Sequence, residues 1–375
     1  MEILAEQLAR IVREPMPSPI SSEIIVVQSR GMERWISMEL AMHNGVCANC
    51  FFPFPNLFLQ EIFKKFIPDM PDESVFDPVA MTFRIMKILP TCSNLPGFES
   101  LKRYLVDDVK GMKLFQISQK TAELFQISQK TADLFDQYLV FRPEMIFRWE
   151  KGKEDHWQAQ LWREISSGKD NLHRARMRKT LLEKIKKQPH EIKNLPDRIS
   201  IFGISYLPPF HLDTFIEISR LSQVNLFLMN PCREYWAEIV SPRQIKEIQR
   251  KYITSTGITE DLYLEEGNRL LASMGTLGRN FFSMISGIDC QIFEQFKDAE
   301  ERSMLSKIQS DILNLKDRGF SRLDSDPDLN TSDISSPSRN RFSLQQDVDT
   351  SVQIHSCHSP MREIEVLHDN LLATF

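Results

Sequence analysis

Glycine is scarce in this chain, and its scarcity bears on nucleotide chemistry. There are 13 glycines among 375 residues, about half the share of an average protein. None stands in a G-x-x-x-x-G-K-[ST] or G-x-G-x-x-G pattern, and the two Gly-Lys pairs, Gly152-Lys153 and Gly168-Lys169, continue with an acidic residue. A phosphate-binding loop needs unhindered backbone amides, a lysine on the phosphates and a hydroxyl on Mg²⁺. These residues therefore contain no such loop.

Cysteine is also sparse, and its spacing is irregular. Six cysteines exclude a disulfide scaffold and indicate a reducing compartment, so we expect a cytoplasmic protein. Cys47 and Cys50 are the only close pair, and without two further ligands we interpret them as buried or incidental thiols. His355, Cys357 and His358 stand within four residues, but no second ligand cluster accompanies them. We interpret them as turn residues around a helix start and expect no bound metal.

Long apolar runs and hydrolase motifs are missing as well. No run of 18 apolar residues occurs, so we expect no membrane span. The N-terminal segment is amphipathic and mixed in charge, unlike a signal peptide. There is no H-E-x-x-H, and the one Gly-x-Ser, Gly203-Ile204-Ser205, does not continue as a G-x-S-x-G nucleophile turn. We assign no catalytic residue and expect no activity from this chain alone.

The charge is slightly acidic overall but strongly basic in one stretch. With 46 basic and 51 acidic residues the net charge is -5, which excludes a general polyanion binder. Residues 163–193 nevertheless carry ten Lys or Arg against four acids. One interpretation is a solvated helix face. The other is a surface that binds the phosphates along a nucleic-acid strand, centred on Arg174, Arg176 and Arg178.

The beginning and the second half of the chain show an α/β pattern. Apolar residues at helical spacing predict a helix over 2–14, and four β-branched residues in 22–29 predict a strand buried on both faces of a parallel sheet. Met32, Trp35, Ile36 and Leu40 predict a helix over that sheet. The pattern resumes with strands at 198–205 and 224–231 around a helix at about 209–221, followed by helices at about 243–253 and 267–286.

Between these parts, residues 56–194 read as a helical insertion without strands. Two of its helices are marked by apolar residues at helical spacing: Phe58, Ile62 and Phe66 in the first, and Val79, Phe83 and Met86 in the second. Residues 321–351, rich in Ser and Asp, read as a flexible linker. A strand at 352–356 and a helix capped by Ser359 and Pro360 then begin a new βα unit. Because two elements cannot form a stable domain, we interpret the chain as a fragment or as the first piece of a split protein.

One segment is repeated without change. LFQISQKTA occupies 114–122 and again 124–132. Ten residues of helix add about 15 Å, and the second copy faces a direction rotated by about 80°. We interpret the repeat as a tandem duplication inside a helix. We expect the first copy to be looped out or to lengthen the connection near Gly111.

Several long strings resemble one known family. KLFQISQKTADLFDQYLVFRPE, ISIFGISYLPPFHLDTF, LFLMNPCREYW, GNRLLASMGTLGRNFF and SCHSPMREIEVLHDNLL are similar, in order, to the N-terminal third of the exodeoxyribonuclease V gamma subunit (RecC) family. The family has one copy of the repeated segment, so the duplication is a departure. The resemblance implies a superfamily 1 helicase-like (RecA-like) parallel-sheet domain that has lost its ATPase, with a helical insertion.

On this resemblance the chain divides into five parts. Residues 1–55 and 195–320 form the first RecA-like domain, 56–194 its helical insertion and 321–351 the linker, and 352–375 start a second, truncated RecA-like domain.

The resemblance also implies a function in DNA repair and recombination. The family's subunit is the non-motor partner of RecB-like and RecD-like subunits in a heterotrimeric helicase–nuclease. It handles forked duplex and single-stranded DNA and scans for the Chi sequence, while the partners use ATP and Mg²⁺, so no cofactor is expected in this chain. Two alternatives stay open: a non-functional fragment of a split or truncated gene, and an ATP-driven helicase in its own right.

Position by position, the family's DNA-channel wall falls on Gln28, Arg30, Arg34, Phe54, Gln60, Asp133, Leu134, Asp136, Arg142 and Arg174. Glutamines and aspartates can read base edges, and arginines can hold phosphates or stack on bases. Arg176 and Arg178 join this set from the basic stretch. Arg30, Arg34, Phe54 and Gln60 depart from the family's pattern, which puts the identity of any recognised DNA sequence in question.

Overall fold

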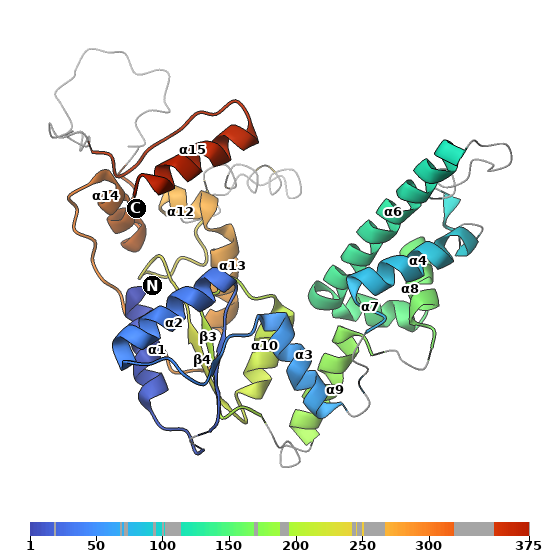
Figure 1. Cartoon of the computed structure of the whole chain (residues 1–375), viewed down its shortest axis with the longest axis horizontal. Coiled ribbons are helices and arrows are strands. Elements are labelled where there is room, and N and C mark those ends of the chain that lie inside the picture. The colour runs from blue at the N-terminus through green and yellow to red at the C-terminus, as the bar shows by residue number, and fades with distance from the viewer. Residues whose placement is uncertain are drawn as a thin grey trace. The chain divides into compact units, whose positions relative to one another are not determined.

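Figure 1 shows the computed structural model of the chain. Its contacts divide it into two compact units, Met1–Met229 and Asn230–Phe375. The structure describes residues 1–18, 20–67, 70, 74–92, 95–99, 101, 114–168, 172–187, 195–241, 245, 250, 267–318 and 349–374.

A four-stranded sheet lies at the centre of the first unit. β1 (Glu23–Val26), β2 (Cys50–Phe51), β3 (Arg198–Phe202) and β4 (Gln223–Phe227) are all parallel, in the order β2-β1-β3-β4. All five residues of β3 are buried, so both faces of the sheet are covered. The strands predicted at 22–29, 198–205 and 224–231 are confirmed. β2 was not predicted, because two residues carry no periodic signal.

Two helices from the start of the chain pack on this sheet. α1 (Glu2–Arg13) and α2 (Arg30–Asn44) bury Leu8 and Ile36 against Ile25 of β1. The Ser29 hydroxyl accepts a hydrogen bond from the amide of Met32 and so begins α2, and Gly45 ends it with a positive φ of 79°. Cap residues of these types are typical of helix ends. Both predicted helices are confirmed, as is the helix near 209–221, which is α10 (Pro209–Ile218).

Between β2 and β3 the described residues form helices and the loops that connect them, and no strand. This segment contains α3 (Pro55–Phe66), α4 (Pro78–Cys92), α6 (Leu114–Phe141), α7 (Pro143–Glu150), α8 (Trp157–Ser166) and α9 (Arg174–Lys187). α4, α6, α7 and α8 share a core that includes Ile85, Phe135, Trp149 and Trp162. The rings of Phe135 and Trp162 meet edge to face, with centroids 5.4 Å apart.

The helix predicted from Val79, Phe83 and Met86 exists, but another side of it is buried. Met81, Ile85 and Leu89 enter the core, whereas Val79 and Phe83 are exposed. α4 carries apolar residues on more than one side, so their spacing alone does not identify the face that packs.

The interpretation of the repeat as a duplication inside a helix is confirmed, but the prediction that the first copy is looped out or lengthens the connection near Gly111 is wrong. Both copies lie in α6, one continuous helix of 28 residues. The expected rotation is visible in equivalent residues ten apart: Thr131 and Ala132 of the second copy are buried, whereas Thr121 and Ala122 of the first copy are exposed. Leu134 is half-buried, and Phe135 and Leu139 fill the core positions beside it. A continuous helix is favoured because ending it would leave backbone groups without partners.

The second unit is built around one tryptophan. Trp236 stacks on Phe282, with ring centroids 5.7 Å apart, and donates its indole hydrogen to Asn230 at 2.9 Å. Gly278 lets the indole approach closely, because an added Cβ would lie 3.2 Å from Cη2 of Trp236. The unit also contains α12 (Arg269–Met274), α13 (Thr276–Ser286), α14 (Met304–Leu313) and α15 (Pro360–Leu372). The helical prediction for 267–286 is therefore confirmed.

The predictions for the end of the chain have mixed outcomes. The helix that begins after Ser359 is confirmed as α15, with the Ser359 hydroxyl accepting from the Arg362 amide. The strand predicted at 352–356 is wrong: these residues pair with no strand, and Ile354 is almost fully exposed. A strand needs a neighbour, and none lies beside this segment in the described part of the chain. The predicted linker and the helix at 243–253 lie almost wholly outside the described residues.

Candidate nucleic-acid interface

The first group of candidate residues lies where the parallel strands end. Gln28 and Arg30 follow β1, Arg34 lies one turn into α2, and Phe54 follows β2. Ligands of open parallel sheets bind at this carboxyl edge, beyond the strand ends. We call Gln28, Arg30, Arg34 and Phe54, together with Gln60 on α3, the sheet-edge group.

Arg30 organises the sheet-edge group. Its guanidinium carbon lies 5.4 Å from the centroid of the Phe54 ring, and its Nη1 lies 2.6 Å from a carboxylate oxygen of Glu33. The side chain is 77% exposed, so its remaining donors face solvent. An exposed guanidinium resting on an aromatic ring can bind a phosphate or stack with a base. Gln28 and Arg34 are exposed beside it, whereas Gln60 is half-buried.

The second group lies on the C-terminal half of α6 and on the residues it contacts. Asp133 is exposed, while Leu134 and Asp136 are half-buried. Nη1 of Arg174, the first residue of α9, lies 3.1 Å from Oδ1 of Asp136. Burial raises the pKa of Asp136, and the charge of Arg174 opposes that rise. Arg142, just after α6, is exposed and lies over the ring of Tyr138. We call Asp133, Leu134, Asp136, Arg142 and Arg174 the α6 group.

The arginines at the centre of the basic stretch have acidic partners. Arg176 lies 2.8 Å from Glu150, and Arg178 lies 2.8 Å from Asp213. Arg178 is only 17% exposed. These ion pairs reduce the positive charge that α9 offers to a phosphate. The structure therefore gives α9 a packing role that the count of basic residues did not reveal.

One acidic partner, Glu150, belongs to a buried polar cluster at the start of α9. His173 is fully buried; its Nε2 contacts Glu150 at 2.8 Å and its Nδ1 accepts from the Arg176 amide. Burial raises the pKa of Glu150, but hydrogen bonds and charge from His173 and Arg176 outweigh it and bring the pKa to about 2. Glu150 therefore stays ionised at neutral pH, and the cluster anchors α9 to α7.

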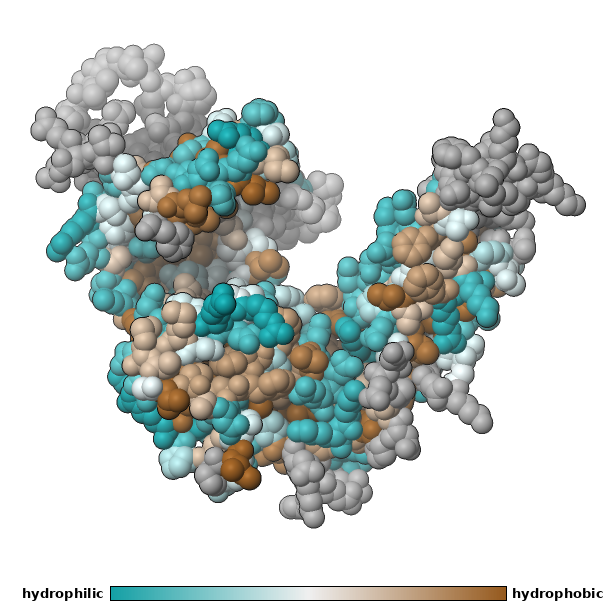
Figure 2. Space-filling view, in the orientation of Figure 1, coloured by the Kyte–Doolittle hydropathy of each residue, from teal (hydrophilic) through white to brown (hydrophobic). Residues whose placement is uncertain are grey.

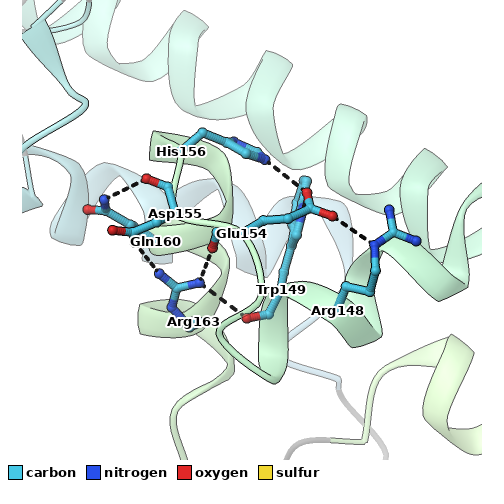
Figure 3. A network of polar contacts seen from close by, with 7 residues as sticks. All are labelled: Arg148, Trp149, Glu154, Asp155, His156, Gln160 and Arg163. Atoms are coloured by element: carbon cyan, nitrogen blue, oxygen red, sulfur yellow. Dashed lines mark hydrogen bonds and ion pairs between the residues drawn. The ribbon is translucent and has the colours of Figure 1, made fainter.

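A second polar network holds the turn between α7 and α8 (Figure 3). Glu154 accepts from Nε of Arg148 at 2.8 Å and from the indole of Trp149 at 2.7 Å. Arg163, counted among the basic residues, donates to the carbonyl of Glu154 and to the carboxylate of Asp155. Its donors are thus used inside the protein, which favours a structural role over phosphate binding.

Sequence reasoning missed a buried histidine between the two groups. His211, on α10, is 4% exposed, and its Nε2 lies 2.8 Å from Oδ1 of Asn56 at the start of α3. Burial, together with the charges of Arg174 and Arg178, lowers the pKa of His211 to about 4. The histidine is therefore neutral at pH 7. A lone histidine in a helix has no motif that could have revealed this position.

The Cys47 and Cys50 pair lies at the start of β2. Cys50 begins β2, and burial, reinforced by Cys47, raises the pKa of its thiol to about 12. Such a thiol is a poor nucleophile. Among the residues that the structure describes, no group of three or more His, Cys, Asp or Glu is placed to hold a metal ion. No helix in the described ranges is long and apolar enough to cross a bilayer.

These features define a mixed α/β protein. A helical segment separates β2 from β3 along the chain, and the parallel sheet presents polar side chains at its carboxyl edge. The family model for the RecC N-terminal domain matches residues 1–315. The chain belongs to the RecC family.

Curated relatives carry the same family name. RecBCD enzyme subunit RecC of Escherichia coli (strain K12) is 33% identical, with 100% of this chain covering 34% of that protein. The protein of the same name from Haemophilus influenzae is 31% identical over 96% of this chain and 34% of its own length, and that of Mycolicibacterium smegmatis is 26% identical over 99% and 30%. The chain thus spans about a third of the length of the curated relatives it matches.

Proposed function

We propose that this chain supplies part of the DNA-guiding wall of a RecC-type subunit, which handles single-stranded and forked DNA during double-strand-break repair and recombination. The contact of Arg30 with Phe54 at the carboxyl edge of the sheet carries this proposal. It combines a solvent-facing cation with an aromatic ring, the pair of groups that binds single strands without a nucleotide site. The α6 group adds carboxylates that can accept from exocyclic amines of bases, and scanning for Chi would use both groups.

The parallel sheet supports a RecA-like domain as its framework. On this proposal residues 1–55 and 195–320 form the domain, 56–194 its insertion and 321–351 a linker, with 352–375 starting a second such domain. The exposed apolar residues Ile364, Leu367 and Leu371 of α15 support the last assignment, because an amphipathic helix needs an apolar partner surface. Hydrophobic and hydrophilic residues both reach the surface over α15 (Figure 2).

The proposed partners follow from the names of the relatives. They are RecB-like and RecD-like subunits in a cytoplasmic heterotrimer, in which the partner subunits would use ATP and Mg²⁺. This chain would then contribute DNA contacts rather than catalysis.

Binding of single-stranded DNA tests the proposal. Fluorescence anisotropy with a labelled oligonucleotide, repeated over a series of salt concentrations, yields the slope of log affinity against log salt. Each lost phosphate contact lowers that slope by about 0.7 on single strands. We expect a smaller slope for Arg34→Gln and for Arg142→Gln. Arg10→Gln is the matched control, since Arg10 is an exposed arginine on α1, paired with Glu6 and outside both groups. Equal slopes in all three variants would contradict the proposal.

A further inference from the structure

A continuous set of contacts joins the sheet-edge group to the α6 group. It passes through α3, α10 and α9, which carry few of the predicted DNA contacts. α3 begins directly after Phe54 and carries Gln60, and Arg174 of α9 contacts Asp136 of α6. What holds α3 and α9 together therefore sets the distance between the two groups.

α3 is held at both ends. At its start Asn56 is paired with the buried His211 of α10, at 2.8 Å. At its end the carbonyl of Phe66 accepts from Nζ of Lys184 on α9, at 2.6 Å. Between these points Phe58 stacks on Phe215 of α10, with centroids 5.6 Å apart and planes 8° from parallel. Two polar contacts and one stacked pair leave α3 little freedom to slide or rotate.

α9 is fixed to α10 mainly by Arg178, which uses both sides of its guanidinium fork, and further along by an ion pair of Lys186 with Glu217 at 3.6 Å. Nη2 of Arg178 lies 2.8 Å from Oδ2 of Asp213, and its Nε donates to Oγ1 of Thr214 at 3.3 Å. The guanidinium carbon also lies 5.3 Å from the centroid of the Phe210 ring. Thr214 is fully buried, and Arg178 is largely so. A planar fork fixed at several points is a rigid connector.

We infer that Arg178 and His211 are positioning residues that set the spacing of the sheet-edge group and the α6 group, and that Arg178 does not bind phosphate. This inference rests on the function proposed above, because the spacing matters only if both groups contact one strand. On this inference Arg178 connects α9 to α10 and is not part of a phosphate-binding surface. We call Arg178 and His211, with their contacts to α10 and α3, the joint. It also gives a task to a buried histidine that has none in DNA contact.

A distance measurement tests the joint without DNA. Ketone-bearing amino acids introduced at Met38 on α2 and Gln137 on α6, both exposed, can be labelled without involving the six cysteines. Pulsed electron resonance then reports the distribution of the distance between them. We expect a broader or shifted distribution in Arg178→Gln and His211→Phe. His211→Gln keeps a donor for Asn56 and should resemble the unchanged protein, as should Arg10→Gln. An unchanged distribution in both Arg178→Gln and His211→Phe would overturn the inference.

DNA binding then separates positioning from contact. Arg178→Gln and His211→Phe should weaken single-strand affinity by roughly 2–30-fold, the range for residues that couple two sites. Their salt slopes should stay unchanged, whereas Arg142→Gln should lower the slope by about 0.7. A lower slope in Arg178→Gln would overturn its positioning role. If the unchanged protein binds no single strand, the proposed function fails, while the distance measurement still decides whether the joint exists.

Discussion

At the scale of single residues, buried polar groups decide how this protein responds to pH and substitution. His211 and the pair formed by Glu23 and Arg198 are each enclosed by neighbouring elements. Burial makes a charged group costly unless a partner of opposite charge compensates for it. His211 avoids that cost by staying neutral, whereas Arg198 and Glu23 neutralise each other. Replacing the neutral histidine and replacing one partner of the ion pair should therefore affect stability in different ways.

His211 should make the first unit sensitive to mild acid. Its pKa is about 4 in the folded chain, against an ordinary value near 6.5. Between these two values the unfolded chain binds a proton that the folded chain does not, so stability falls as the pH drops from about 6.5 to 4. His211→Gln should flatten this dependence. Thermal midpoints at pH 7.5 and pH 5 measure it, with His368→Gln on the exposed α15 as the control. Equal acid sensitivity in the two variants would contradict the prediction.

Arg198 should be among the least replaceable residues of the sheet. Its Nε lies 3.1 Å from Glu23, its Nη2 contacts the other carboxylate oxygen, and Nη2 also donates to the carbonyl of Glu14. Removing one partner leaves a buried charge uncompensated, so Arg198→Met should destabilise by about 3–5 kcal/mol. Adding Glu23→Leu should recover much of the loss. Arg10→Met, which breaks an exposed pair with Glu6, should cost less than about 1 kcal/mol. Urea denaturation of the four proteins provides the comparison.

At the scale of elements, α6 shows how the same nine residues take two environments. A ten-residue repeat rotates a helix face by about 80°, so equivalent side chains cannot all reach the core. Thr131 and Ala132 of the second copy are buried, whereas the equivalent Thr121 and Ala122 of the first copy are exposed. Phe135, which follows the second copy, fills the core between Trp149 and Trp162. Among the side chains described on α6, the buried ones begin at Ser128, after the first copy.

Packing of α6 should therefore be insensitive to the first copy. Phe135→Ala should destabilise by about 3–5 kcal/mol, because it empties a buried aromatic site, while Phe125→Ala, at a partly exposed phenylalanine of the second copy, should cost less than about 1 kcal/mol. The first copy is tested by removing it. Deleting residues 113–122 should be neutral or stabilising. Thermal denaturation of the three variants tests this. A deletion that lowers the midpoint as much as Phe135→Ala would show that the first copy is part of the packed core.

At the scale of the whole molecule, the sequence contains no phosphate-binding loop, which predicts how the purified chain behaves with ATP. No glycine in the sequence stands in a phosphate-binding pattern. We expect the chain on its own neither to hydrolyse ATP nor to cut DNA. The measurement is DNA-stimulated phosphate release and oligonucleotide cleavage, compared with a blank purification. Activity that rises with the concentration of the purified chain, above that blank, would contradict the expectation.

Several helices and the longer strands could be predicted from local patterns in the sequence. Four β-branched residues in a row indicate a strand enclosed on both faces, and Ser359 with Pro360 indicates a helix start. These features depend on neighbours in the chain, so α1, α2, β1 and α15 were predicted correctly. The family resemblance rested on long strings of residues, which the comparisons confirmed.

Faces, pairings and the environment of charges came from contacts between distant parts of the chain. Met81 rather than Val79 is buried because α6 and α8 cover that side of α4, and no spacing rule contains that information. Residues 352–356 form no strand, because a strand depends on pairing with a neighbouring strand as much as on its own residues. Arg178 is a candidate phosphate ligand by composition, and only the fold shows that Asp213, 35 residues later, pairs with its guanidinium. Local propensity acts within a few residues, whereas burial and ion pairing depend on the fold that brings remote residues together.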